Sequence, residues 1–393
     1  MDILYHCRAG LDVHKKTVVA CVRRIGPDGQ VEQETRTLAT MTADLLALAD
    51  WMAACGIGHA AMESTGIYWK PVWHLLEDRF TLVLVNARHM RQVPGPKTDV
   101  KDSQWIAQLL QHGLLSPSFV PPPPIREPRD LTRRRTQLVA DRAAVANRVQ
   151  KVLEAANVKL SSVATDVLGA SGRAMIARLI AGETDAELLA DEARGTLRRK
   201  LIPLRQALAG RVTEHHRFQL RMLMDQVRHL EEWIARLDGR VVEVMTPVVA
   251  GEPDRPPPLG EAVRRLMTVP GIGRRAAEVI VAEVGPDVRN FATAGHLASW
   301  AGLCPGNNQS GGKRRSSQTP KGNSSLRVML VQVAWAASHT KQTVLSQTYR
   351  RLAKRLSKKK ALVALGHKLL RIIHRLLSRG VDYVEYQNPG LAA

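Results

Sequence analysis

The sequence from residue 97 to residue 107 reads Lys97-Thr98-Asp99-Val100-Lys101-Asp102-Ser103-Gln104-Trp105-Ile106-Ala107 and predicts the start of a helix. Asp99 and Asp102 project from one face of this helix, because positions three apart are neighbours on a helical surface. Ile106, Leu109 and Leu110 continue at helical spacing and predict that the helix packs on a core. Two carboxylates held in this way can bind a hard cation such as Mg²⁺. The simpler interpretation is that both acids stabilise the first turn through the helix dipole, with Asp99 as an N-cap.

The residues before this helix predict a mixed β-sheet covered by helices. Apolar alternation indicates strands, and longer amphipathic stretches indicate helices. An antiparallel opening followed by alternating helices and strands is typical of an α/β domain, which we place at residues 1–118. The expected strands cover residues 4–12, 17–24, 31–38 and 81–85, with one more ending at Glu63; the expected helices cover 43–54 and 69–76, and the hairpin turn is Gly26-Pro27-Asp28-Gly29.

Two more acids stand where strands of this sheet are expected to end. Asp12 closes the first strand, in Gly10-Leu11-Asp12-Val13-His14-Lys15, and Glu63 closes the fourth. Because sites in open α/β sheets form at strand ends, Asp12 and Glu63 are expected to converge with Asp99 and Asp102. Four carboxylates can hold two Mg²⁺ ions beside a phosphodiester. The simpler interpretation of each residue alone is that Asp12 is a turn residue at a strand end and that Glu63 is an acid at the start of a helix.

Positive charge is concentrated in the last quarter of the chain. The 393 residues carry a formal net charge of +21, with room for two or three domains. From Val288 to Val381 there are 18 Lys and Arg residues and no Asp or Glu. A field of this sign favours a polyanion, bound through phosphate neutralisation and counterion release.

The composition argues against a membrane or secreted protein. No apolar run approaches the roughly 20 residues of a spanning helix, and polar residues interrupt the N-terminus where a secretory signal would be apolar. The cysteines show neither CxxC nor Cys/His metal spacing, so we expect reduced thiols in a cytoplasmic protein. They are Cys7, Cys21, Cys55 and Cys304.

The middle of the chain, residues 126–250, is predicted to be helical. Pro121 to Pro124 predict a stiff extended linker, and residues 126–156 predict one long helix with an apolar and a cationic face. Residues 201–244 carry heptad-like apolar spacing, which indicates a coiled coil that either folds back within the chain or pairs two subunits. The cationic face suits a nucleic-acid backbone, or is simply solvated. Its candidate contacts are Arg133, Arg134, Arg135, Arg142 and Arg148, with Lys151.

A second Pro- and Gly-rich linker, residues 251–260, precedes a helical region at 261–385. Residues 266–277 contain Val269-Pro270-Gly271-Ile272-Gly273 and have the form of a helix-hairpin-helix motif. Gly271 and Gly273 would let a DNA backbone approach the free N–H groups of the second helix. The alternative is a glycine-rich turn between packed helices.

A glycine-rich loop follows, in which Ser310-Gly311-Gly312 precedes a cluster of cations. From residue chemistry alone, such a serine most often donates a hydrogen bond to phosphate; it acts as a nucleophile where cations stabilise the developing charge. The cations are Lys313, Arg314, Arg315 and Lys321. Further basic residues, Arg350, Arg351, Lys354, Arg355 and Lys358 to Lys360, predict a phosphate-tracking or solvated surface.

The sequence resembles the DEDD transposases, bridge-RNA-guided serine recombinases of bacterial insertion sequences. The likeness rests on Gly-Leu-Asp-Val-His-Lys at 10–15, Met-Glu-Ser-Thr-Gly-Ile-Tyr-Trp at 62–69 and Lys-Thr-Asp-Val-Lys-Asp at 97–102. It implies a RuvC-like N-terminal domain of the ribonuclease H fold, whose Mg²⁺-binding tetrad would be Asp12, Glu63, Asp99 and Asp102. Tyr68 and Trp69 would stack on bases or belong to the core, and Arg88 and Lys97 would contact phosphate or remain solvated.

The resemblance extends to the C-terminal region, where Val269 to Ala337 look like the transposase domain that carries the nucleophilic serine. Ser310-Gly311-Gly312, Lys321-Gly322-Asn323 and Leu326-Arg327 match its elements, whereas Ser316-Ser317-Gln318-Thr319-Pro320 departs from the pattern. The departure leaves Ser316, Ser317 and Ser324 as weaker nucleophile candidates. The coiled-coil middle would serve RNA binding and dimer or tetramer assembly.

The function expected from this resemblance is RNA-guided cutting and rejoining of DNA through a phosphoserine intermediate, with Mg²⁺ and a structured guide RNA. The ester retains the bond energy, so no nucleotide cofactor is expected, and the sequence lacks a GxxxxGK[ST] loop. One alternative is a RuvC-like two-metal endonuclease or transposase in which water or a DNA hydroxyl attacks. Another is a non-catalytic nucleic-acid-binding protein.

Overall fold

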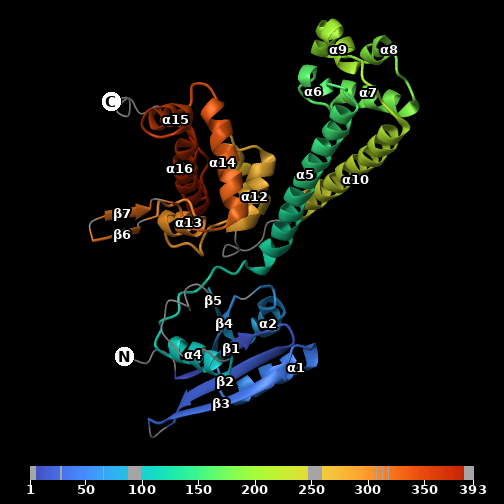
Figure 1. Cartoon of the computed structure of the whole chain (residues 1–393). Helices are drawn as coiled ribbons and strands as arrows, with labels where there is room; N and C mark the ends of the chain where they lie inside the picture. Colours follow the sequence, from blue (N-terminus) through green and yellow to red (C-terminus); the bar gives the residue numbers. More distant parts are fainter. Residues whose placement is uncertain are drawn as a thin grey trace. The chain divides into compact units, whose positions relative to one another are not determined.

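The computed structural model describes residues 6–26, 29–64, 66–86, 99–246, 259–306, 308–311, 313–316 and 318–384; within these ranges it leaves out the side chains of 99–101, 308–310 and 313–316. The chain divides into two compact units, Met1–Val120 and Pro121–Ala393 (Figure 1). Among the described helices, none combines the length and apolarity needed to cross a bilayer.

The first unit is built on a five-stranded mixed sheet in the order β3-β2-β1-β4-β5. The first three strands are antiparallel neighbours, and β4 lies parallel to both β1 and β5. The predicted α/β arrangement is confirmed. The strands are β1 Cys7–Val13, β2 Thr17–Ile25, β3 Val31–Ala39, β4 His59–Glu63 and β5 Thr81–Val85.

Helices cover both faces of this sheet. Alternate residues of β1, Ala9 and Leu11, are fully buried in the core that includes α1 (Thr42–Ala54) and α2 (Trp69–Leu76). On the opposite face, α4 (Asp99–Gln111) buries Ile106 and Leu110 against Ala61 of β4. Side chains alternate between the faces of a strand, so each layer receives every second residue.

Two long helices dominate the first half of the second unit. Helix α5 (Pro123–Ala155) and helix α10 (Glu214–Met245) lie side by side over most of their length (Figure 1). Their shared core includes Leu138, Val145, Val227 and Leu230. The second amphipathic stretch therefore folds back within the chain. Short helices close one end: α6 Leu160–Val163, α7 Ala170–Ala181, α8 Ala186–Ala190, the 3₁₀ helix η1 Gly195–Lys200 and α9 Leu201–Leu208.

Three sequence expectations for this half were wrong in detail. Pro123 begins α5, because a proline is tolerated where a helical N–H has no partner, so the extended linker ends at Pro122. The expected continuous helix 201–244 is broken at residues 209–213, between α9 and α10. Gly260 lies in the next helix and not in a linker, whereas residues 251–258 lie outside the described part of the chain.

The second half of this unit is a helical bundle around α14 (Ser324–His339) and α16 (Lys358–Arg379). A short two-stranded sheet replaces the open loop expected around Ser310; β6 (Asn308–Ser310) pairs antiparallel with β7 (Lys313–Ser316). Gly311, at φ +57°, supplies the left-handed turn that such a tight hairpin needs. The remaining helices are α11 Leu259–Met267, α12 Arg274–Val284, α13 Ala294–Trp300 and α15 Val344–Arg355.

Candidate active site

Asp12 and Glu63 lie at corresponding ends of neighbouring strands. The parallel register pairs Leu11 of β1 with Met62 of β4, so the next residue of each strand is an acid. Asp12 shares the strand face of Gly10, and Glu63 shares that of Ala61. Both of these smaller residues face α4. The two carboxylates therefore belong to one edge and one face of the sheet.

Helix α4 approaches that face at backbone contact distance. A Cβ on Gly10 would lie 2.1 Å from the carbonyl oxygen of Ser103 and 2.5 Å from the amide nitrogen of Ala107. Only glycine lets the helix lie this close to β1. Ser103 is fully buried in the contact, and Asp102 immediately precedes it. Gly10 therefore sets the height at which α4 carries its acids.

A second contact fixes the direction of α4. The Arg23 Nε donates to the Gln111 Oε1 at 2.9 Å, and Arg23 pairs with Arg8 at the start of β1. The end of α4 therefore lies over the start of β1, and the start of α4 points toward the strand end that carries Asp12. Asp99 lies at this start in the backbone, although its side chain lies outside the described part.

The described carboxylates do not by themselves close a metal site. Among the residues the structure describes, no three His, Cys, Asp or Glu side chains are grouped closely enough to hold a metal ion. The Asp12 side chain, 16% exposed, has its Oδ2 3.1 Å from the His14 Nε2. Asp12 and Glu63 thus share a sheet edge, and Asp102 lies near the start of α4, but these three side chains are not grouped closely enough to hold an ion; the side chain of Asp99 lies outside the described part.

The two aromatic candidates beside Glu63 have different environments. Trp69 packs edge-on against Trp73, with ring centroids 6.0 Å apart, and lies against the main core. Tyr68 precedes α2 and is 39% exposed. Trp69 is therefore a core residue, and Tyr68 remains available for stacking. The phosphate candidates Arg88 and Lys97 lie outside the described residues.

Ser310 and Ser316 are described only in their backbone, whereas Ser324 is described in full and is exposed. Ser310 ends β6 and pairs with Lys313, the first residue of β7. The side chains of Lys313, Arg314 and Arg315 lie outside the described part, as does all of Ser317. Ser316 ends β7, Ser324 begins α14, and Lys321 is exposed between them. The hairpin thus presents Ser310 next to its turn.

The expected cationic face of α5 is largely neutralised within the protein. Arg133 binds Glu283 through two hydrogen bonds, Arg135 lies 2.5 Å from Asp238, and Arg142 lies 2.7 Å from Glu231. Arg134 and Arg148 are exposed, as a nucleic-acid contact requires. For the other three arginines, nucleic-acid binding would have to displace an ion pair.

Two glycines lie in the turn between α11 and α12, and only one of them is open to a ligand. A Cβ on Gly271 would lie 2.6 Å from the amide nitrogen of Ala337, so this glycine serves packing against α14. Gly273 caps α12 and has no atom within 4 Å of an added Cβ. The neighbouring Arg274 and Arg275 are held by buried Glu278. Only Gly273 remains open to a phosphate.

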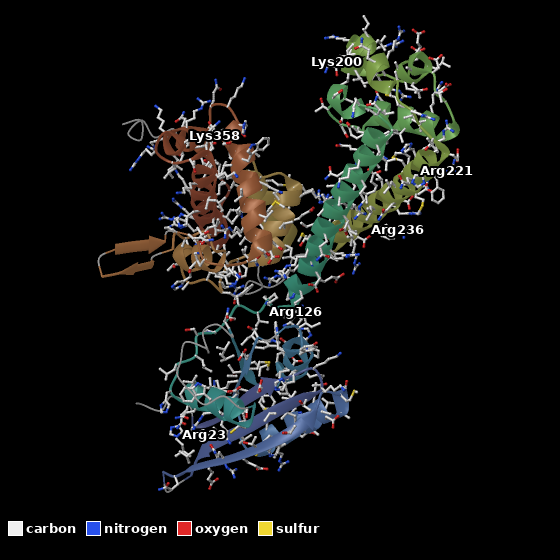
Figure 2. The ribbon with its side chains drawn as sticks, viewed as in Figure 1. Arg23, Arg126, Lys200, Arg221, Arg236 and Lys358 are labelled. Carbon is white, nitrogen blue, oxygen red and sulfur yellow. The ribbon has the colours of Figure 1, made fainter. Side chains whose placement is uncertain are left out.

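Other cations are freely presented. All seven basic residues expected to track phosphate on α15 and at the start of α16 are exposed. Lys358 marks this segment in Figure 2. The residues are Arg350, Arg351, Lys354, Arg355, Lys358, Lys359 and Lys360.

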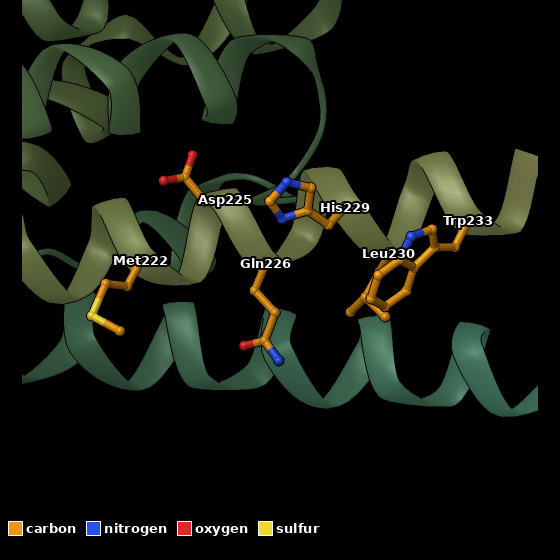
Figure 3. Close-up of a pocket in the computed structure, with 6 residues that line it drawn as sticks. All are labelled: Met222, Asp225, Gln226, His229, Leu230 and Trp233. Carbon is orange, nitrogen blue, oxygen red and sulfur yellow. The ribbon is translucent and has the colours of Figure 1, made fainter.

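Helix α10 also leaves apolar side chains uncovered. Phe218, Met222 and Trp233 are 55%, 59% and 48% exposed at helical spacing. A shallow groove runs between Met222 and Trp233 and is also lined by Asp225, Gln226, His229 and Leu230; Phe218 lies outside it (Figure 3). The groove therefore combines exposed apolar side chains with polar ones on a single helix.

Glu283 was not among the residues singled out from the sequence, and Gly10 and Asn323 appeared there only within longer motifs, with no role of their own. Glu283 left a usable signal, because it is an acid within the apolar run Val279-Ile280-Val281-Ala282-Glu283-Val284. A buried acid requires partners, and here they come from α5 and Asn323. Gly10 left no such signal, since its requirement arises from a helix 93 residues later in the chain.

Comparison with known proteins matches two family models. A transposase domain of the DEDD type in IS110 elements matches residues 9–158, and the transposase domain of the IS116/IS110/IS902 family matches residues 263–350. A protein named "Probable family 20 transposase" from Pseudomonas aeruginosa is 28% identical over 340 residues, or 84% of each chain.

Shorter matches point the same way. The "Pilin gene-inverting protein" of Moraxella bovis is 29% identical over 156 residues, covering 39% of this chain and 46% of its own length. An IS110 insertion-element protein of Streptomyces coelicolor is 33% identical over 129 residues, covering 32% of this chain and 31% of its own. The chain is thus a transposase or DNA recombinase, in which two regions match transposase domains of IS110 elements and of the IS116/IS110/IS902 family.

Proposed function

We propose that this transposase cuts and rejoins DNA under the direction of a structured guide RNA, through a covalent link to Ser310 and with Mg²⁺ bound by Asp12, Glu63, Asp99 and Asp102. The observation that carries the proposal is the seating of α4 on Gly10. It directs the acidic start of α4 toward the sheet edge that ends in Asp12 and Glu63. We assign this unit to the RuvC-like ribonuclease H class.

The donor chemistry of this edge fits Mg²⁺, which prefers carboxylate oxygens and keeps part of its water shell. When bound, the ion would supply electrostatic stabilisation of charge on a scissile phosphate. The described residues contain no complete group of three ligands. The proposal therefore requires Asp12, Glu63 and Asp102 to move closer together when the ion binds, Asp99 to complete the site, and Asp12 to exchange its contact with His14 for the ion.

The proposed covalent step conserves the number of phosphoester bonds. The Ser310 Oγ forms a bond to phosphorus and loses its proton to solvent or a nearby base, while the bond from phosphorus to one strand oxygen breaks. That oxygen leaves as a hydroxyl after taking up a proton. Attack by a DNA hydroxyl on the phosphoserine reverses the step and releases Ser310. Lys313, Arg314, Arg315 and Lys321 would stabilise the charge on phosphorus-bound oxygens.

Binding of DNA and guide RNA would use the cations that the fold leaves exposed. Arg134, Arg148 and the seven basic residues of α15 and α16 are exposed and offer phosphate contacts. Gly273 offers an open helix N-terminus. Tyr68 is placed to stack on a base. A homo-oligomer, dimer or tetramer, would cover Phe218, Met222 and Trp233 on α10.

A two-metal transposase without a covalent intermediate is the second candidate. It is favoured by the position of the acids at one sheet edge, because that arrangement alone serves attack by water or a DNA hydroxyl. In this case Ser310 would only bind phosphate. A non-catalytic binding protein, the remaining alternative, agrees poorly with the transposase domains.

The deciding experiment asks whether DNA stays covalently attached to the protein after denaturing lysis. The protein is expressed with its native flanking DNA, as wild type, Ser310→Ala and Asp12→Asn. An adduct that maps to Ser310 and disappears in both variants is the expected result. Recombination products without any adduct would favour the two-metal alternative. Asp102→Asn should also abolish strand cleavage while RNA binding remains close to wild type.

A further inference from the structure

The buried acid Glu283 connects three parts of the second unit. Its Oε1 accepts a hydrogen bond from the Arg133 Nε at 2.7 Å. Its Oε2 accepts from the Arg133 Nη2 at 3.0 Å, the Arg129 Nη2 at 2.8 Å and the Asn323 Nδ2 at 2.6 Å. Glu283 itself is 0% exposed. A carboxylate can be buried only with such partners, so the bonds to α5 and to Asn323 are mutually dependent.

Asn323 marks the point where the segment carrying Ser310 rejoins the helical bundle. Its Oδ1 accepts from the amide of Leu326 at 3.0 Å and so caps α14. The backbone N–H of Asn323 donates to the backbone carbonyl of Trp300, at the end of α13, at 3.1 Å. One side chain therefore ties the start of α14 to α12, while its backbone ties it to α13.

The two arms of this segment, residues 302–306 and 318–322, meet at backbone distance. A Cβ on Gly322 would lie 2.3 Å from the amide nitrogen of Gly302, and one on Gly306 would lie 2.1 Å from the carbonyl oxygen of Gln318. Arg327 of α14 adds a hydrogen bond to the Thr319 Oγ1 at 2.8 Å. The arms form a narrow stem, from which the β6–β7 hairpin extends (Figure 1).

We propose that Glu283 is a positioning residue, which holds this stem on α5 through Asn323 and thereby fixes the hairpin that carries Ser310. The inference rests on the proposed role of Ser310. Glu283 does not touch DNA in this proposal; it acts through Asn323 and the stem. Arg129 and Arg133 come from the long helix α5, so the hairpin is fixed relative to the helical part proposed to bind RNA.

The test uses the full-length protein and the variant Asn323→Ser. A serine hydroxyl can still cap α14 but is too short to keep the bond to Glu283. Thr343→Ala is the matched control, since Thr343 caps α15 through the amide of Ser346 and has no link to the stem. Glu283→Gln changes the other partner of the Asn323–Glu283 hydrogen bond by removing its charge. This variant replaces Asn323→Ser in the test if Asn323→Ser does not fold.

Hydrogen exchange of residues 302–323 is the first measurement, because it does not depend on Ser310 being the nucleophile. We expect exchange about tenfold faster in Asn323→Ser and Glu283→Gln but not in Thr343→Ala. Unchanged exchange would overturn the inference. The second measurement is the rate of adduct formation at saturating DNA, expected to fall about 10- to 100-fold while DNA affinity stays within about twofold.

These two measurements separate the two proposals. A wild-type adduct that does not map to Ser310 would refute the proposed nucleophile and, with it, the role of Glu283 in positioning Ser310; faster exchange would then leave Glu283 a purely structural residue. An adduct at Ser310 whose rate is unaffected in a folded Asn323→Ser protein would overturn the positioning role while leaving the nucleophile intact.

Discussion

Helix α4 of the first unit and helix α5 of the second unit of this transposase are held by different kinds of contact. In the first unit, α4 lies on Gly10 through a close contact of uncharged backbone atoms. In the second, α5 is tied to α10 and α12 through ion pairs such as Arg135–Asp238, Arg142–Glu231 and Arg133–Glu283. A contact of the first kind tolerates no added atom, whereas one of the second kind depends on charge and salt. Adding volume at Gly10 and removing charge from the partners of α5 therefore test these two kinds of contact separately.

The largest effect is expected from Gly10→Ala. The added Cβ would lie 2.1 Å from the Ser103 carbonyl oxygen, so α4 must move and the start that carries Asp99 and Asp102 must move with it. Overpacking of this kind costs about 1–3 kcal/mol of the free energy of unfolding. A displacement of about 1 Å would lower strand cleavage about 100-fold. Thermal unfolding and a cleavage assay measure the two effects.

Gly58→Ala is the matched control for this substitution. Gly58 belongs to the same unit, and a Cβ there would meet no atom within 4 Å. Its variant should cleave DNA at the wild-type rate. Equal cleavage by both alanine variants would show that the height of α4 above β1 does not matter for the reaction.

The next largest effect, a loss of stability, is expected from Asp238, which forms ion pairs with two other helices. Asp238 of α10 lies 2.5 Å from Arg135 of α5 and 3.1 Å from Arg275 of α12. Asp238→Asn should lower the free energy of unfolding by about 1 kcal/mol, because the acid is 24% exposed and both arginines lose their counter-charge. The loss should shrink when the denaturation series is repeated at high salt. Asp225→Asn, which breaks an exposed ion pair with Arg228, should change the free energy of unfolding little. If it lowers that free energy as much as Asp238→Asn does, the ion pairs between helices contribute no more than an ordinary surface pair.

The sequence predicted the helices and strands, which follow from local patterns. It did not predict the ion pairs and close glycine contacts, which depend on residues distant in the chain. The strands and the long helix α5 follow from local periodicity, and the structure contains them; it also has helices on both sides of the glycine-rich turn between α11 and α12, although the helix-hairpin-helix motif itself stays a prediction. The ends of β1 and β4 placed Asp12 and Glu63 correctly, because parallel strands end at one edge. The ion pairs of Arg133, Arg135 and Arg142 join residues about 90 to 150 positions apart, so no local pattern could indicate that this cationic face is paired. The same holds for Gly10 and Gly271, whose neighbours come from later helices.

A smaller effect separates paired from exposed cations in nucleic-acid binding. Lys358→Ala should lower the slope of log affinity against log salt by about 1 if Lys358 contacts one phosphate, because one fewer counterion is released. Arg142→Ala, which removes a cation already bound to Glu231, should leave the slope unchanged. Binding is measured with a labelled duplex over a series of salt concentrations. A reduced slope for Arg142→Ala alone would show that the ion pair opens on binding.

The smallest effect concerns the pH dependence of a charged cluster at the end of the second unit. Arg264 lies 2.8 Å from Glu261 and 2.9 Å from Asp382, and these bonds hold the pKa of each carboxyl below its usual value. A carboxyl whose pKa is lowered by folding stabilises the folded state above its usual pKa of about 4, and that contribution is lost as the pH falls through the lowered value. The melting temperature of wild type should therefore fall more between about pH 5 and about pH 2 than that of Asp382→Asn. Because the cluster is solvent-exposed, the difference should be small and should diminish in high salt. Parallel melting curves would show instead that the Arg264 cluster does not contribute to the stability of the folded chain.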